Sequence, residues 1–131
     1  MTTEQREKIE HVLHTNKFGV IATVGPTAPE SAVITIITST HEFEIVFGSF
    51  KGFRKNDNIK QNPNVSFVIG WDENLKQTVQ IESTAKLLSD SDALSYVEHL
   101  DPEKEYFKIT PQWMRYSDFA LKPREVWEIE L

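Results

Sequence analysis

The segment FGSFKGFRKNDNIKQNPNVSFVIGW, residues 47–71, places a strand, a basic loop with two glycines, a helix and another strand in direct succession. We expect the helix to run from about Phe53 to Gln61, because Asn62 and Pro63 form a clear stop signal. The β-branched and aromatic residues that follow predict a strand over residues 65–71. The basic loop therefore lies where a strand passes into a helix.

This loop carries a concentrated positive charge. Lys51, Arg54 and Lys55 are three and four residues apart, so they can share one face of the first helical turn. A helix N-terminus carries a partial positive charge, which makes cations there unfavourable unless an anion is bound. Backbone N–H groups, the Ser49 hydroxyl and flanking Lys and Arg side chains together suit a phosphate group. The loop therefore indicates a phosphate site.

A second interpretation fits the same residues. The loop can be a solvated basic helix start, with Phe50 and Phe53 buried in the core. Both interpretations share the same secondary structure and differ only in whether a ligand binds. The loop by itself leaves both open.

Outside this segment, strand signals dominate the chain. An N-terminal helix is expected, where Thr2 and Gln5 can form a capping box and Asn16 can end the helix. Residues 31–38 are apolar on both faces, which predicts a central strand buried on both sides. We expect the other strands over residues 18–24, 43–47, 79–87, 106–109, 113–119 and 127–131, with a helix after Asp90 that bears Leu94, Val97 and Leu100.

These elements predict a mainly β protein with α+β elements, made of six to seven antiparallel strands and two to three short helices. The links between strands are short, which favours antiparallel pairing. No strand has an obviously polar edge, so a closed barrel without exposed edges is favoured. We find no repeat or linker and expect one domain over residues 1–131.

Composition excludes several functions. The chain has 14 Lys and Arg against 20 Asp and Glu, a net charge of -6, which disfavours nucleic acids and anionic membranes as partners. The absence of cysteine excludes disulfides, iron–sulfur clusters and thiol catalysis. The polar N-terminus is no secretory signal, and no apolar run could span a membrane. We therefore expect a cytoplasmic location.

Histidine offers only a weak metal signal. His11 and His14 could share a helix face with Glu7 and Glu10. No further ligand motif converges on them, and surface histidines of this kind are common. We expect no metal site, and no Ser–His–Asp spacing is recognisable.

The chain resembles the pyridoxamine 5′-phosphate oxidase-like family of FMN-binding split β-barrels. The resemblance rests on residues 47–71 together with FGVIATVG (18–25), AVITIIT (32–38) and TVQIESTAKLL (78–88). Its centre is a strand that ends in Ser, an Arg-Lys pair, a helix with Asn, and then Asn-Pro-x-Val before the next strand. It implies an antiparallel split β-barrel that binds a flavin.

The resemblance also implies which residues bind the cofactor. The positions that match the FMN phosphate site are Ser49, Arg54 and Lys55. Lys51 lies in the same loop but at no fixed motif position, so it is the weaker candidate. No catalytic residue is implied.

Two strands are implied to lie along the flavin ring. The strand at Ile34, Thr35 and Ile36 would offer backbone groups to the isoalloxazine ring. Thr78 falls where relatives often place a polar residue near the flavin, and it also fits an ordinary strand threonine.

Relatives build the flavin site between two subunits, which implies a homodimer with two flavins. Trp113 and Arg115 fall in a segment that reaches across that interface in relatives. Trp113 could pack against a flavin, or it could serve plain core or interface packing. Arg115 could pair with the phosphate or the pyrimidine edge.

The implied activity is an FMN-dependent oxidoreductase with an unidentified small-molecule substrate. True pyridoxamine phosphate oxidases end in an Arg-x-His pair that grips the substrate phosphate, and the ending KPREVWEIEL lacks it. The vitamin B6 reaction itself is therefore doubtful. The alternatives are a non-catalytic flavin or haem carrier or stress sensor, and a barrel for protein interaction. A deazaflavin such as F420 is less favoured, because few basic residues lie outside 51–60.

Overall fold

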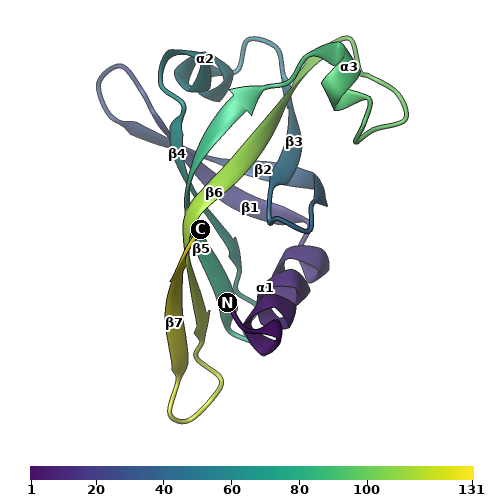
Figure 1. Ribbon diagram of the computed structural model, residues 1–131. Helices are drawn as coiled ribbons and strands as arrows, with labels where there is room; N and C mark the ends of the chain where they lie inside the picture. The colour runs from purple at the N-terminus through teal and green to yellow at the C-terminus, as the bar shows by residue number, and fades with distance from the viewer.

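The computed structural model describes residues 1–131. Three helices and seven strands follow one another along the chain (Figure 1). Their bounds are α1 (Thr3–Thr15), β1 (Phe18–Val24), β2 (Pro29–Ser39), β3 (Ile45–Phe50), α2 (Arg54–Gln61), β4 (Asn64–Gly70), β5 (Gln77–Leu87), α3 (Asp90–Ala93), β6 (Lys104–Asp118) and β7 (Glu125–Glu130).

The strands form one antiparallel sheet that closes on itself. Their order is β3-β2-β1-β4-β5-β6-β7, and a further pairing of β3 with β6 joins the first six strands into a barrel. The long strand β6 makes this closure possible, because its first half pairs with β3 and its second half pairs with β7. The β6–β7 hairpin extends below the barrel in Figure 1. The predicted split β-barrel is confirmed.

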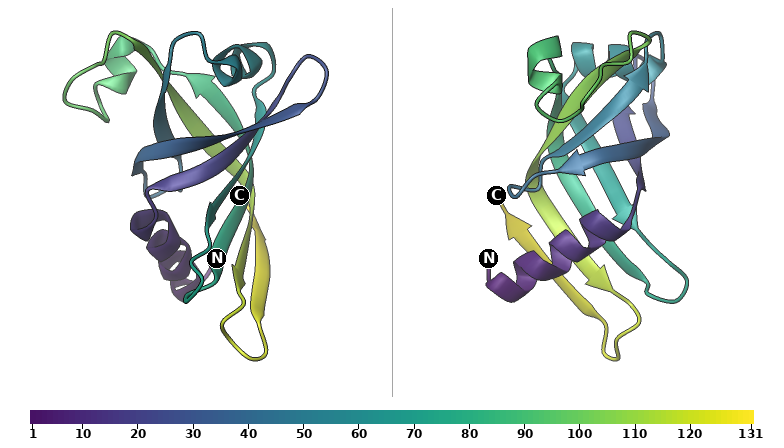
Figure 2. Two further views of the ribbon diagram at one scale, coloured as in Figure 1. Left: turned by 180° about the vertical axis from the view of Figure 1, so that it is seen from behind. Right: turned by 90° about the vertical axis from the view of Figure 1, so that its right-hand side faces the viewer.

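The barrel interior holds one continuous apolar core. Nineteen buried residues contact one another there, and α1 contributes Ile9, Val12 and Leu13. Phe47 and Phe107 face each other across the β3–β6 seam with ring centroids 5.4 Å apart. The predicted apolar face of α1 therefore packs on the barrel, at its lower end in Figure 2.

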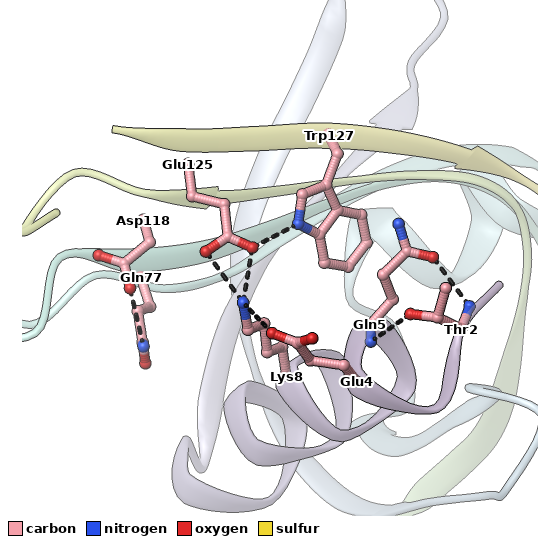
Figure 3. A network of polar contacts seen from close by, with 8 residues as sticks. All are labelled: Thr2, Glu4, Gln5, Lys8, Gln77, Asp118, Glu125 and Trp127. Carbon is pink, nitrogen blue, oxygen red and sulfur yellow. Dashed lines mark hydrogen bonds and ion pairs between the residues drawn. The ribbon is translucent and has the colours of Figure 1, made fainter. Parts of the chain in front are cut away.

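Polar contacts hold α1 against β7, as Figure 3 shows. The predicted capping box is present, with Thr2 and Gln5 exchanging two hydrogen bonds of 3.0 Å. Lys8 Nζ donates to both carboxylate oxygens of Glu125 at 2.7 and 2.9 Å. Trp127 Nε1 donates to the same carboxylate at 2.9 Å. The hydrogen bonds from Lys8, and then from Trp127, hold the pKa of Glu125 below its usual value.

The prediction that residues 31–38 are buried on both faces is wrong. Ile34 points into the core, whereas Val33, Thr35 and Ile37 on the opposite face are exposed, Val33 by 66%. β2 is central within the sheet because it pairs with both β1 and β3. Only one face of a barrel wall meets the core, so central pairing does not bury both faces of this chain.

Three boundaries also differ from the prediction. The helix after Asp90 is one turn long and is capped by Ser89, and Leu94 is half exposed. The two strands expected over 106–109 and 113–119 are one strand, β6. β3 starts at Ile45, because Phe43 has a φ of 64° inside a turn and cannot continue a strand.

No helix is long and apolar enough to cross a membrane. The chain also has no group of three or more His, Asp or Glu side chains placed to hold a metal ion.

Candidate functional site

The basic loop, residues 48–55, runs from the end of β3 through a tight turn into the first turn of α2. It carries hydrogen-bond donors that have no acceptor. Gly52 has a φ of 88°, a conformation that residues with a Cβ rarely adopt. Phe53 is the N-cap of α2, and no side chain caps this helix. The backbone N–H groups of Arg54 and Lys55 donate to no acceptor within the chain. The start of α2 therefore presents free donors, which is the arrangement that anions favour.

Ser49 lies beside these donors with an unsatisfied hydroxyl. Its side chain is only 4% exposed, and its Oγ has no hydrogen-bond partner. Leaving a buried polar group unpaired costs about 1–3 kcal/mol. Ser49 lines a hollow together with Lys55 and Lys104, so a polar ligand that reaches its hydroxyl would supply the missing partner.

Asn56 fixes the shape of the loop. Its Nδ2 donates to the backbone carbonyl of Phe50 at 2.9 Å and to Glu105 at 3.2 Å. Glu105 also accepts from Lys60 at 2.6 Å, and this hydrogen bond lowers the pKa of Glu105. The fully buried Asn56 thus ties α2 to the end of β3 and to β6.

Lys55 carries a charge that no carboxylate neutralises. It is half-buried, and burial lowers the pKa of its ammonium. It forms no ion pair, and its Nζ lies 4.5 Å from the centre of the Phe53 ring. An ammonium group that loses water without gaining a counterion favours binding of an anion.

Arg54, in contrast, already has a partner. Its guanidinium forms an ion pair with Glu30 of β2, although its side chain is 76% exposed. The other oxygen of Glu30 accepts from Asn58 Nδ2 at 2.8 Å. Sequence reasoning missed Glu30 and Asn58. The four-residue spacing of Arg54 and Asn58 on α2 was the only local signal, and it did not point to Glu30.

Two adjoining hollows lie between β2 and the basic loop. The larger, about 760 Å³, is lined by Thr23, Glu30, Ser31, Ala32, Val33, Gly52, Phe53, Arg54 and Lys55. The smaller, about 250 Å³, is lined by Val33, Ile34, Thr35, Ile37, Gly48, Ser49, Phe50, Phe53, Lys55 and Lys104. They share Val33, Phe53 and Lys55. The structure therefore brings the predicted residues of β2 and of the loop together in part: Ile34, Thr35, Ser49, Arg54 and Lys55 line these hollows, whereas Ile36 lines neither.

The alternative of a solvated basic helix start predicts that Phe50 and Phe53 are buried in the core, and that prediction is wrong. Phe50 and Phe53 are 44% and 49% exposed. Their rings contact each other edge to face, with centroids 5.7 Å apart. Both phenylalanines line the smaller hollow, where they add apolar surface opposite β2.

Lys51, the weaker candidate, is exposed in the same loop and lines neither hollow. The side chains of Ile34 and Ile36 face the core, whereas Thr35 faces outward. Thr78 is half-buried and pairs with Gly70 on one side and Ser117 on the other.

Trp113 and Arg115 do not contact the basic loop within one chain. Both are on the second half of β6, where Arg115 Nε donates to Glu128 at 3.0 Å and the guanidinium lies 5.4 Å from the Trp113 ring centre. The hydrogen bond from Arg115 lowers the pKa of Glu128.

These residues nevertheless share the outer face of the barrel with β2. The strand register aligns Val33, Val20, Val68, Gln80 and Arg115 in one row across five strands, all facing away from the core. Four strand spacings separate the ends of this row, about 19 Å along the sheet. The three valines at one end are exposed and adjacent.

Comparisons with known proteins give the same fold. The general stress protein 26 of Bacillus anthracis aligns with a TM-score of 0.76 and 22% identity, over 98% of this chain and 100% of that one. A pyridoxamine 5′-phosphate oxidase-related, FMN-binding protein of Nostoc punctiforme aligns with a TM-score of 0.75 and 14% identity, over 99% and 97%.

A haem-binding protein of Mycobacterium smegmatis shares the fold as well, with a TM-score of 0.75 and 14% identity, over 99% of this chain and 59% of that one. The sequence itself matches the family model described as pyridoxamine 5′-phosphate oxidase over residues 5–130. That match covers almost the whole chain, and the strand–loop–helix segment at residues 47–71 lies inside it. The chain therefore belongs to the pyridoxamine 5′-phosphate oxidase family.

Proposed function

We propose that this protein binds FMN and acts as a flavin-dependent oxidoreductase. One observation carries the proposal: Ser49, whose buried hydroxyl has no hydrogen-bond partner, lines the same hollow as Lys55, a partly desolvated cation without a counterion. The uncapped start of α2 adds backbone donors. A phosphate monoester would satisfy all three at once.

The flavin ring would lie along β2, beside Ile34, Thr35 and Ile36. The smaller hollow runs from Ser49 to Thr35 and is bordered by exposed apolar side chains, including Val33 and Phe50. Cofactor sites commonly combine a largely apolar wall with a few placed polar groups. This composition suits an aromatic ring whose tail ends in phosphate.

The outer face supports a homodimer in which each site is completed by the partner. The exposed row of Val33, Val20 and Val68 would be covered by a second copy of the same face. Because a two-fold axis superposes opposite ends of such a row, it would bring the partner subunit's Arg115 and the partner subunit's Trp113 toward β2. Thr78 lies on this face as well.

We prefer FMN over haem and F420 because of the side chains that line the two hollows. Neither hollow is lined by His, Met or Tyr, the side chains that would ligate a haem iron. Lys104 is the only additional cation in the lining, which offers little to the longer anionic tail of F420.

The flavin would supply the hydride-transfer chemistry when bound. The chain's own residues would bind the phosphate, order the ring against β2 and exclude water between two subunits. The proposed site contains many groups that can bind a ligand and no evident acid–base pair. This composition agrees with a protein that binds the flavin and leaves the hydride transfer to it.

The test is a fluorescence titration of the purified protein with FMN, with riboflavin as the control that lacks phosphate. Quenching of FMN with a clear preference over riboflavin supports the proposal, and the absence of FMN binding refutes it. Reduction of the bound flavin by a nicotinamide cofactor or a screened substrate then supports the oxidoreductase. A flavin that binds but is never turned over would indicate the carrier instead.

A further inference from the structure

Glu30 links β2 to the first turn and the middle of α2. It lies opposite Thr23 in the β1–β2 register, and its carboxylate lines the larger hollow. One oxygen accepts from Asn58 Nδ2 at 2.8 Å, and the other accepts from the Arg54 guanidinium. Arg54 and Asn58 are one helical turn apart and thus share a face of α2.

The carboxylate is fixed from its buried side. Asn58 is 6% exposed and donates a second hydrogen bond to Thr23 Oγ1 at 3.0 Å. Thr23 is itself buried on β1. The Glu30 carboxylate is therefore anchored by the buried Asn58, which Thr23 holds in turn, whereas the side chain of Arg54 is 76% exposed. The fixed member of the ion pair is Glu30, and the member that it orders is Arg54.

The pairing leaves most of the guanidinium available. A guanidinium has five N–H donors, and Glu30 engages only those of Nη2. The remaining donors can bind an anion beside Lys55, which lines this hollow with Arg54 and Glu30 and also lines the smaller hollow with Ser49. An arginine ordered in advance loses less conformational freedom when its ligand binds.

We propose that Glu30 is a positioning residue that orders Arg54 for the phosphate of the ligand. This inference rests on the proposed FMN function and assigns a role to a residue outside the loop. Ordering one long side chain in advance is worth about 2- to 10-fold in affinity. The opposite possibility is that the Glu30 charge repels the phosphate, in which case its removal would tighten binding.

The two possibilities differ in sign, and Glu30→Gln separates them. The amide keeps the length of the side chain and an oxygen that can accept from Asn58, but it removes the charge that holds Arg54. We expect the Kd for FMN to rise about 2- to 10-fold, with the Kd for riboflavin unchanged. In an Arg54→Ala background, Glu30→Gln should have no further effect on FMN binding.

Glu98→Gln, an exposed site on another loop, is the control for the change in net charge. Tighter or unchanged FMN binding in Glu30→Gln refutes the proposal. So does an effect that persists without Arg54, or an equal loss of riboflavin affinity, which indicates a general structural defect. Wild-type protein that fails to bind FMN instead refutes the proposed function, so the two failures are distinguishable.

Discussion

Lys55→Met removes the cation that lacks a counterion and keeps most of the side chain's apolar surface. A charge-assisted hydrogen bond contributes about 1.5–3 kcal/mol, and each 1.4 kcal/mol is about tenfold in Kd. Lys55 is half-buried, so solvent screens part of this interaction. The full range of about 1.5–3 kcal/mol corresponds to about 10- to 140-fold in Kd. We therefore expect the Kd for FMN to rise about 10- to 30-fold, in the lower part of the full range.

The free protein should behave in the opposite way. Because burial lowers the pKa of Lys55, its charged form is disfavoured in the folded state. This cost is fully present below the folded pKa and is relieved as pH rises through it toward the usual value of 10.5. At pH 7 the substitution removes that cost and loses a weak contact with Phe53. We expect the Tm without FMN to stay unchanged or rise slightly.

The assay is fluorescence quenching of FMN and riboflavin by wild type, Lys55→Met and the control Lys122→Met, which removes an exposed lysine of the β6–β7 loop. The expected result is a loss of FMN affinity in Lys55→Met alone, with riboflavin affinity unchanged in all three proteins. Equal FMN affinity in Lys55→Met and wild type would refute the phosphate site at this loop. A parallel loss of riboflavin affinity would show that Lys55 acts on the ring or on the fold.

Three further outcomes test the interface and the fold. Val20→Glu places charge in the exposed valine row, so light scattering should show monomers with weakened FMN binding; an intact dimer would place the interface elsewhere. Gly19→Ala puts a Cβ 2.2 Å from the Phe67 ring, and urea unfolding should show a loss of about 1–3 kcal/mol; unchanged stability would contradict the packing. Glu125→Gln should lower the Tm at pH 7, where the carboxylate pairs with Lys8. That difference should vanish well below pH 4.5, because the lowered pKa of Glu125 makes its stabilisation disappear as pH falls.

The barrel and the strand–loop–helix segment could be predicted because their signals are local. Alternation of apolar and polar residues marks β7, and Asn62-Pro63 ends α2 where expected. The exposure of the outer face of β2 could not be predicted in this way. An apolar outer face gives the same sequence pattern whether it is covered by its own chain or by a second chain. Here the chain leaves Val33 uncovered.

The short α3 and the role of Glu30 needed tertiary information. Residues after Ala93 were predicted to continue a helix, but Val97 instead packs against a small cluster that includes Leu88 and Tyr106. Glu30 is 24 residues from Arg54, and nothing near Glu30 in sequence indicates that pairing. Local patterns thus located the basic loop but missed the acidic residue that pairs with Arg54.

We propose that residues 48–55, from the end of β3 to the first turn of α2, bind the phosphate of FMN. The most direct test is the spectrum and mass of the small molecule that copurifies with the protein, followed by titration of the stripped protein with FMN. We expect a flavin absorption spectrum, the mass of FMN and one FMN bound per subunit. A colourless protein that does not quench added FMN, or a Soret band from bound haem, would contradict it.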